Sequence, residues 1–373
     1  MAEKKKTGAR REKVRKSMIT LLTVGVLYLL SSPAPNALGK EPEEIWKDLS
    51  KVSMEERESH LLLGAKSEGT VVLYANIEPP MLQSLKSDFE KRFPGIKMDL
   101  WRGAGSKTPN RVSTEARAGR FAVDVISLGN EHVPLMLQFR LVGRYVSPER
   151  RFLPDDSKDR EGYWTSYRRA LPVIAYNTRL VSAKEAPRNY EEFLTQKWKG
   201  DFAIDMEPHM ATMGWLKLWG FEKTEKFMAS LVKNDVVVRK GHDLLTELLC
   251  AGEFKGAIEL YAHRVAYAKH VEGCPVEMIY PDPTPGALTH LLIAKHAPHP
   301  YAAALLFDYI FSEPGQKILA DLGALVNRKG IMPKYPELDI EGKRVRVLVA
   351  TPDDAIRLGK MYEQLQQKFL LKR

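Results

Sequence analysis

Between residues 71 and 139, short runs rich in β-branched and apolar residues alternate three times with stretches whose apolar residues recur at helical spacing. The predicted strands are residues 71–74, 96–101 and 123–126, and the predicted helices are residues 81–93, 112–118 and 133–139. Such alternation builds a parallel sheet with right-handed crossovers. Because ligands of these sheets gather beyond the carboxyl ends of the strands, the loops 75–78, 102–106 and 127–131 are the first candidates for a binding site.

A second strand-and-helix set follows a long extended run at residues 169–178. Its predicted elements are a helix near 190–194, a strand at 201–205, helices across 211–232, a strand at 236–239, a helix at 244–251 and a strand at 256–260. Another extended run, 276–293, leads to helices at 300–311 and 315–322. Two extended crossings between two α/β sets predict two lobes joined by a two-strand hinge, with the first lobe discontinuous in sequence.

The N-terminal segment has the pattern of a secretory signal. Residues 1–17 carry eight Lys or Arg and two Glu, and the 13 residues 18–30 carry no charge, which is too short for a standard transmembrane helix. Pro33 and Pro35 end the apolar run, and the small residues at 37–39 predict cleavage before Lys40. An uncleaved signal anchor is the alternative. Either way the body is expected to be periplasmic or extracellular.

These features set the expected boundaries. They are a signal peptide at 1–39, a first part of lobe 1 at 40–170 with a helical extension at 41–68, lobe 2 at 171–283, and a return to lobe 1 with C-terminal helices at 284–373. Two cysteines, Cys250 and Cys274, would then lie in an oxidising compartment. Their spacing leaves open whether they form a disulfide or remain two buried thiols.

Charge argues against a nucleic-acid partner. The 373 residues include 57 Lys or Arg and 47 Asp or Glu, a formal charge of +10, but residues 18–373 hold 49 and 45. A nearly neutral body lacks the basic surface that nucleic-acid binding requires. A hydrophobic content of 44% is sufficient for a folded core.

Common catalytic motifs are missing, so we expect no enzymatic activity. The sequence holds no Gly-x-Ser-x-Gly elbow and no His-Glu-x-x-His motif. The segment 103–107, GAGSK, lacks the spacing of a Walker loop, and Thr108 stands where a dinucleotide fingerprint needs its third glycine. Its glycines are equally explained by a tight turn. A secreted hydrolase therefore remains only a remote alternative.

Several segments together resemble the extracellular solute-binding proteins of bacterial ABC transporters, in the branch that includes ferric-iron-binding periplasmic proteins. They are FEKRFPGIK (89–97), WRGAG (101–105), RVSTEARAGR (111–120), DVI (124–126), IAYNT (174–178), KWKGDFAI (197–204), AGE (251–253), APHPYAAA (297–304) and SEPGQ (312–316). The resemblance covers about residues 68–330. It implies a type II periplasmic-binding-protein fold, a ligand clamped between the lobes, delivery to an ABC permease in the inner membrane, and no chemistry on the ligand.

The resemblance also implies a ligand set. Ferric iron in this branch is typically held by two adjacent tyrosines, often with a His, a Glu and an anion, because hard oxygen ligands suit a trivalent ion. Here Tyr261 matches the first tyrosine, and Ala262 stands at the second position. Tyr261 and Glu131 are the candidate metal ligands. The departure leaves three ligands open: iron(III) itself, an iron chelate, or a small organic anion. Apart from transported Fe(III), no cofactor is expected.

The remaining candidates lie in the predicted loops and strand ends. Arg102, with the amides of 103–106, suits an anion, and tyrosines offer flat walls. The full ligand-binding set is Tyr74, Asn76, Glu78, Arg102, Ser106, Asn130, Glu131, Tyr176, Glu207, His209 and Tyr261. Each also has a structural explanation, such as an acidic residue at a helix N-terminus. The protein is expected to be a monomer, and an anchored sensor built on the same clamp is the alternative to an importer component.

Overall fold

The chain passes from one β-sheet to another at Leu171, which separates β5 (Thr165–Ala170) from β6 (Pro172–Asn177). The computed structural model describes residues 40–103 and 105–371, so the predicted signal peptide at 1–39 lies outside the described residues. Residues 41–373 form one unit of the chain. The extended run at 169–178 was predicted as one element, and the structure shows two strands that belong to different sheets.

Over the described residues, the first sheet has eight strands and defines lobe 1. The order is β12-β5-β11-β3-β1-β2, and both β13 and β4 pair with β11. The additional strands are β1 (Thr70–Ala75), β2 (Lys97–Arg102), β3 (Val125–Gly129), β4 (Val142–Gly143), β11 (Thr284–Ala294), β12 (Leu325–Val326) and β13 (Val347–Val349). The pairings β1–β2 and β1–β3 are parallel, as the strand-and-helix alternation predicts. The strands predicted at 71–74, 96–101 and 123–126 are therefore confirmed.

The second sheet has five strands over the described residues and defines lobe 2, in the order β10-β6-β9-β7-β8. Its further strands are β7 (Phe202–Asp205), β8 (Val237–Arg239), β9 (Gly256–Tyr261) and β10 (Val276–Ile279). β7 is parallel to β8 and β9, whereas β6 runs antiparallel to β9. The carboxyl ends of β7 and β9 therefore lie at one edge of the sheet, and the carboxyl end of β6 lies at the other.

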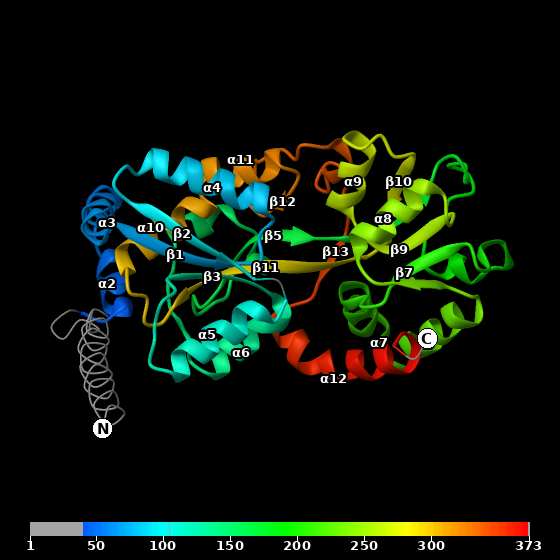
Figure 1. Ribbon diagram of the computed structural model, residues 1–373, viewed down its shortest axis with the longest axis horizontal. Coiled ribbons are helices and arrows are strands. Elements are labelled where there is room, and N and C mark those ends of the chain that lie inside the picture. The colour runs from blue at the N-terminus through cyan, green and yellow to red at the C-terminus, as the bar shows by residue number, and fades with distance from the viewer. Residues whose placement is uncertain (1–39, 104, 372–373) are drawn as a thin grey trace, which may run out of the picture. The chain divides into compact units, whose positions relative to one another are not determined.

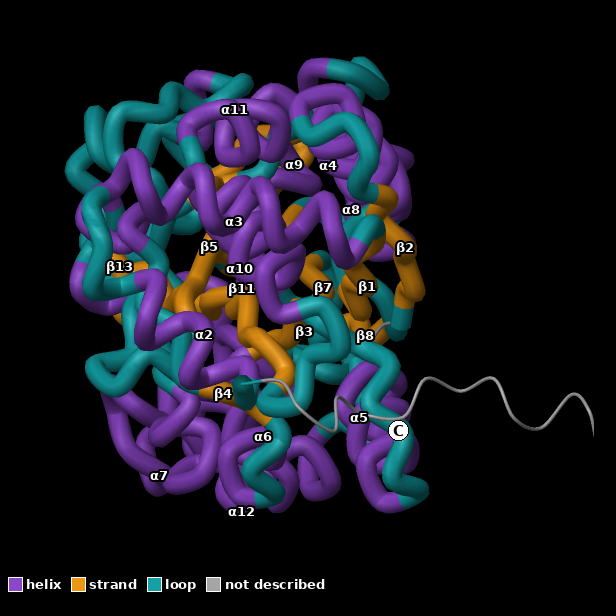
Figure 2. Tube along the Cα trace, turned by 90° about the vertical axis from the view of Figure 1, so that its left-hand side faces the viewer, coloured by secondary structure: helices purple, strands orange, loops and turns teal. Residues whose placement is uncertain are grey.

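Helices cover both sheets (Figure 1). Those of lobe 1 are α2 (Pro42–Leu49), α3 (Met54–Glu68), α4 (Pro79–Arg92), α5 (Lys107–Arg117), α6 (Val133–Gln138), α10 (Pro300–Phe311) and α11 (Glu313–Asp321). Lobe 2 has α7 (His209–Lys233), α8 (His242–Ala251) and α9 (Ala262–His270), and the last helix is α12 (Pro352–Phe369). Figure 2 shows α3 crossing in front of α10, with which it packs. None of the helices in the described part of the chain is both long and apolar enough to cross a membrane.

The N-terminal extension folds as predicted, because its sequence supplies the signals that start and end a helix. Ser53 accepts a hydrogen bond from the amide of Glu56, and the Glu56 carboxylate accepts one from the amide of Ser53, which completes a capping box at the start of α3. Gly69 ends α3 with a φ of 71°, a conformation that favours glycine. The helix then packs on α10, and Leu61 is buried in the core of lobe 1.

Two contacts tie the lobes together beside the crossovers. Gly214 of α7 approaches Pro285 of β11 so closely that an added Cβ would lie 2.5 Å from the Pro285 Cβ. The helix α12 packs against α7 of lobe 2 and against α6 and the short turn Asn130–His132 of lobe 1. Its residues Leu358 and Leu365 are buried in the core cluster that contains α7. C-terminal helices were predicted from the sequence, but the position of α12 across both lobes was not.

One local prediction needs correction, because the helix near 190–194 is a short 3₁₀ turn, Glu191–Leu194. The helices predicted across 211–232 are confirmed as α7, whose two helical parts meet at a kink at the non-helical Gly220. The strand predicted at 256–260 extends to Tyr261, and Ala262 begins α9, which places His263 on a helix.

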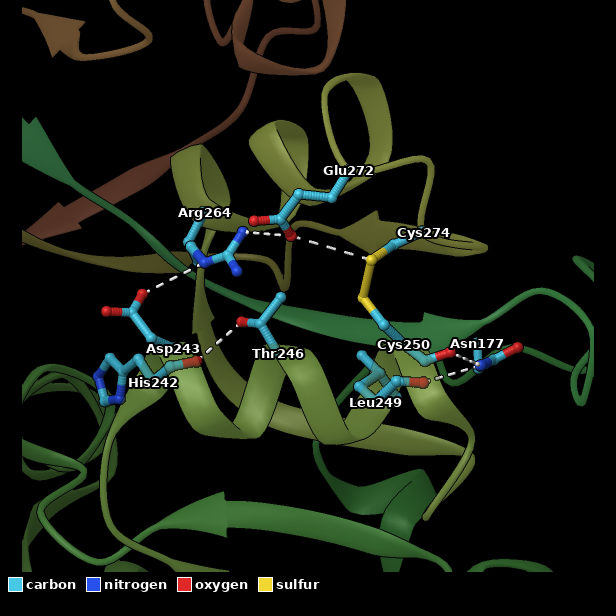
Figure 3. The surroundings of a disulfide bond; sticks show 9 residues. All are labelled: Asn177, His242, Asp243, Thr246, Leu249, Cys250, Arg264, Glu272 and Cys274. Carbon is cyan, nitrogen blue, oxygen red and sulfur yellow. Dashed lines mark hydrogen bonds and ion pairs between the residues drawn. A yellow bond between two sulfur atoms is a disulfide. The ribbon is translucent and has the colours of Figure 1, made fainter.

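The cysteines are paired. Cys250, at the end of α8, forms a disulfide with Cys274, which precedes β10 and is 24 residues further along the chain. Figure 3 shows the neighbouring ion pairs: Arg264 of α9 lies 3.2 Å from Asp243 at the start of α8 and 2.9 Å from Glu272. The disulfide and these pairs connect the two helices whose first residues follow the carboxyl ends of β8 and β9.

Candidate functional site

Tyr261 lies at the carboxyl end of β9, where aromatic and acidic side chains of lobe 2 gather. Its ring packs edge-on against the His242 ring, with 4.0 Å between centroids, and stacks on the His263 ring at 5.6 Å. His242 is the first residue of α8, and its Nδ1 lies 2.8 Å from a carboxylate oxygen of Asp205, the last residue of β7. The ends of two parallel strands therefore place a phenol, two imidazoles and a carboxylate together.

Asp205 is held as a carboxylate. Burial raises the pKa of Asp205, but His242 and the backbone amides of Glu207 and Gly241 all bond to its oxygens, and the net effect is a pKa below the usual range. The hydrogen bonds that these two amides donate to Asp205 measure 2.8 Å each. Asp205 thus contributes a buried negative charge beside Tyr261.

The phenol of Tyr261 is held in its neutral form. Burial raises its pKa well above the usual range, and the nearby Glu259, Asp205 and Glu131 raise it further. A cation placed among these groups would have the opposite effect, because an adjacent positive charge favours the phenolate. The site is therefore arranged to attract positive charge, and binding a metal ion through Tyr261 would release a proton.

Glu259 gives this part of the sheet its irregular geometry. Leu260 pairs with Val173 and Ile258 with Ile174, so Glu259 is an extra residue in a β-bulge and adopts a φ of 68°. Bulges of this kind redirect the side chains that follow them, and strained backbone conformations concentrate at functional sites. One Glu259 oxygen accepts a hydrogen bond from the amide of Ala211 at 3.0 Å, which ties the bulge to the start of α7.

The second Glu259 oxygen is buried and has no hydrogen-bond partner among the described residues. Burial raises the pKa of Glu259 well above its usual range, which favours the protonated carboxyl. Sequence analysis missed this residue because a glutamate inside an apolar strand gives no local signal of a bulge.

Lobe 1 contributes Glu131, which lies in the turn Asn130–His132 after β3. Glu131 interacts electrostatically with Tyr261 and with His209, the first residue of α7. Burial lowers the pKa of His209, Glu131 raises it and His132 lowers it, with the net effect downward. The His209 ring packs edge-on against the Tyr362 ring of α12 at 4.8 Å. Glu131 of lobe 1 and Tyr362 of α12 therefore both interact with residues of lobe 2 in this region.

A second set of electrostatic interactions between the lobes lies nearby. Glu78 precedes α4, and its carboxylate lies 2.6 Å from Arg168 of β5. Both residues affect the pKa of His263 in lobe 2. Burial lowers this pKa most and the positive charge of Arg168 lowers it further, whereas Glu78 raises it, and the net result is a pKa of about 4. His263 is therefore neutral at pH 7 and available as a hydrogen-bonding or coordinating group.

The structure thus brings five predicted residues into one cluster: Glu78, Glu131, Glu207, His209 and Tyr261. Glu207 lies two residues beyond Asp205, interacts electrostatically with Tyr362, and forms an exposed ion pair with Lys240 at 3.3 Å. The residues that sequence analysis missed are Asp205, His242, Glu259, His263, Arg168 and Tyr362. Asp205 and His242 lie at or just beyond the carboxyl ends of parallel strands, where ligands of such sheets gather, so the sequence could have predicted them. The others depend on contacts between distant segments.

Two predicted tyrosines lie elsewhere, which corrects their assignment as walls of the site. Tyr176 pairs with Gly256 whereas Tyr261 pairs with Pro172, so the two are separated by four residues of β6, about 13 Å. Tyr74 is buried in lobe 1, where its hydroxyl lies 3.1 Å from the Glu115 carboxylate and Arg111 stacks on its ring. Both tyrosines have structural roles in these positions.

Four further predicted residues make contacts of their own within lobe 1. Asn76 accepts a hydrogen bond from Ser127 at 3.0 Å, and the Asn130 side chain bonds to His290 and to the carbonyl of Ala350. Arg102 donates to the Ile77 carbonyl at 3.0 Å, and Ser106 precedes α5 without capping it. Among the described residues, none of these four has a hydrogen bond or ion pair with the Tyr261 cluster.

Within residues 40–103 and 105–371, no group of three or more His, Cys, Asp or Glu residues is placed to hold a metal ion. The candidate ligands Tyr261 and Glu131 lie in the cluster on opposite lobes.

The chain belongs to the family of bacterial extracellular solute-binding proteins, whose model matches residues 144–338. Solved structures with the same fold include iron-bound HitA of Pseudomonas aeruginosa, with a TM-score of 0.67, 18% identity, and coverage of 79% of this chain and 99% of HitA. The Trichodesmium protein IdiA (FutA), in complex with iron and citrate, has a TM-score of 0.68, 18% identity and coverage of 81% and 99%. A Bordetella ferric binding protein has a TM-score of 0.68, 20% identity and coverage of 80% and 98%.

These matches confirm the predicted α/β class, the type II periplasmic-binding-protein fold with two lobes, and the solute-binding role. The family and the similar structures are binding proteins, and the family is extracellular. At 16–20% identity, the structural likeness establishes the fold of this chain and not the ligand.

Proposed function

We propose that this protein is the periplasmic solute-binding component of an ABC importer, and that it carries iron(III), free or as a chelate, between its two lobes. One observation supports this most strongly: Tyr261 of lobe 2 lies among Asp205, Glu259 and, from lobe 1, Glu131. Phenolate and carboxylate oxygens are hard ligands that suit a hard trivalent ion.

A ligand that contacts both lobes selects the closed arrangement, because its binding energy is complete only when the lobes meet. Glu131 with Tyr261 and Arg168–Glu78 with His263 are the cross-lobe groups that would respond to closure. A permease in the inner membrane then binds the closed form and receives the ligand unaltered. We further propose that residues 1–39 are a cleaved signal peptide, and that residues 40–170, 171–283 and 284–373 are the first part of lobe 1, lobe 2 and the return segment.

The charge around Tyr261 makes a small organic anion the less favoured ligand. The Arg168 guanidinium, a buried cation that acts on His263, is already paired with Glu78 at 2.6 Å. Arg102, on which the anion hypothesis was based, has no contact with the Tyr261 cluster among the described residues. A metal-free organic anion would therefore need a position in lobe 1 away from the cluster.

A thermal-unfolding panel on the full chain distinguishes these ligands. The panel comprises ferric citrate, citrate alone, iron(III) with a weak chelator, that chelator alone, a phosphonate, thiamine and a polyamine. A ligand present at 100 times its dissociation constant stabilises the protein by about 2.7 kcal/mol, which is a readily measured shift. We expect the iron-containing solutions to stabilise the protein and the iron-free controls to have no effect. Stabilisation by citrate or the phosphonate without iron would contradict an iron ligand.

A further inference from the structure

A cavity of about 400 Å³ lies away from Tyr261 and is lined by residues of β5, β12 and β13. Its lining includes Arg169, Leu325, Ile331, Leu338, Val345 and Val347. A volume of this size is within the range of small-molecule sites in proteins. Arg169 follows Arg168 directly along β5, and successive residues of a strand point to opposite faces. The same strand thus presents one arginine to the Tyr261 cluster and the next to this cavity.

The walls of the cavity come from both lobes. Arg169 and Leu325 are paired residues of β5 and β12 in the sheet of lobe 1. Leu338 belongs to a core cluster made mostly of lobe 2 residues, which also contains Leu325, and the preceding residue, Glu337, bonds to lobe 2. The Glu337 carboxylate lies 2.7 Å from Lys269 of α9, and its carbonyl accepts a hydrogen bond from Tyr280 at 2.9 Å. A ligand in this cavity would therefore contact both lobes on the side of β5 that faces away from Tyr261.

Arg169 is a buried cation with little compensation for its charge. Its side chain is 10% exposed, and its closest carboxylate, Asp156, is 3.7 Å away and 42% exposed. The two hydrogen bonds that it donates go to neutral groups, the Asn327 side-chain oxygen at 2.7 Å and the Ser157 hydroxyl at 3.4 Å. Arg168, by contrast, has a carboxylate at 2.6 Å. Because a buried charge is costly unless paired, Arg169 is suited to receive a carboxylate from a ligand.

The other charged residues of the lining limit the charge of that ligand. Arg328 is already committed to Glu149 at 2.5 Å and to the Phe311 carbonyl at 2.8 Å. Asp339 accepts a hydrogen bond from the Gly342 amide at 2.8 Å, and Glu341 and Arg344 are exposed on the same segment. The two acids would repel a ligand with several negative charges, and the charge of the exposed Arg344 is screened by solvent. The inner part of the cavity therefore favours a single carboxylate, and its apolar walls favour an apolar body.

We propose that this cavity binds a small monocarboxylate with an apolar body. Its carboxylate lies on the Arg169 guanidinium, which presents paired donors of the geometry that carboxylates accept. Its apolar part packs against Leu325, Leu338 and Val347. The cavity is separate from the Tyr261 cluster, so this proposal does not depend on the identity of the transported ligand.

Hexanoate is a suitable probe, and its binding to the full chain is measured by isothermal titration calorimetry. We expect saturable binding of one hexanoate per chain at millimolar concentrations, and no saturable binding of 1-hexanol or hexylamine. Arg169→Gln is expected to weaken hexanoate binding at least tenfold, the effect of losing a charge-assisted hydrogen bond of about 1.5–3 kcal/mol. Arg346→Gln is the matched control, because Arg346 is an exposed arginine of the same segment that pairs with Asp282 and does not line the cavity.

A second variant keeps the proposal testable if Arg169→Gln does not fold. Val345→Trp places a large side chain at the half-buried edge of the cavity and should abolish hexanoate binding while leaving ferric citrate binding intact. The proposal is overturned if the wild-type chain shows no saturable hexanoate binding, if 1-hexanol binds equally well, or if hexanoate binding survives Arg169→Gln or Val345→Trp. If the wild-type chain does not bind iron, the proposed function is contradicted, and the proposal for this cavity is unaffected.

Discussion

Replacing Tyr261 with phenylalanine is expected to weaken iron(III) binding by at least about 100-fold while the protein stays folded. Changes to groups that only support a metal ligand typically cost 10–100-fold in affinity, and loss of a ligand itself should cost at least the upper end of that range. The hydroxyl is the only group removed, so packing of the ring against His242 is retained. Affinity is measured by competition with a chelator of known strength, and unfolding by urea titration confirms the fold.

Tyr176→Phe is the matched control for Tyr261→Phe. Tyr176 is a tyrosine of the same sheet, but it pairs with Gly256 at the far edge from Tyr261. We expect its substitution to leave iron affinity unchanged. Equal affinity of the wild-type chain and Tyr261→Phe would remove Tyr261 from the ligand set, and equal losses in both variants would show that the effect is not local to the site.

Replacing both Cys250 and Cys274 with serine is expected to lower the free energy of unfolding by about 3.5 kcal/mol. The two residues are 24 apart in the sequence, and a cross-link that closes a loop of this length restricts the unfolded chain by about that amount. The measurement is urea unfolding of both proteins without reductant. The wild-type chain with reductant should approach the stability of the double variant.

The same variant tests how the disulfide supports the site. The cross-link joins the end of α8, which begins at His242, to the segment after α9, which carries His263. Arg264 bridges Asp243 and Glu272 in the same region, so we expect the helices to keep their positions and iron affinity to fall less than tenfold (Figure 3). A loss of stability below about 1 kcal/mol would contradict the chain-restriction argument.

Much of the fold was predictable because its signals are local. The alternation in residues 71–139 predicted β1, β2 and β3, and the capping residues Ser53 and Gly69 define α3. The break at Leu171 was not predictable, because both neighbouring strands are extended and only this one residue separates them. The position of α12 was not predictable either, because its buried residues Leu358 and Leu365 contact α7, more than 100 residues away in sequence.

The site was predictable from two sources, the positions of strand ends and the family resemblance. The carboxyl ends of the parallel strands located Glu131, and the resemblance to ferric-iron-binding proteins located Tyr261. Tyr176 was misplaced, because β6 runs antiparallel to β9 and its end lies at the opposite edge. Tyr74 was misplaced because the face to which a strand residue points depends on register, and its side chain lies against Glu115 of α5.

The central claim is that iron(III) binds between the lobes and holds them together. Small-angle X-ray scattering of the full chain, with and without saturating ferric citrate, tests it most directly, with citrate alone as the control. We predict a smaller radius of gyration with ferric citrate, no change with citrate alone, and no change for Tyr261→Phe. Saturable iron binding with superimposable scattering profiles would contradict closure of the lobes around the ligand.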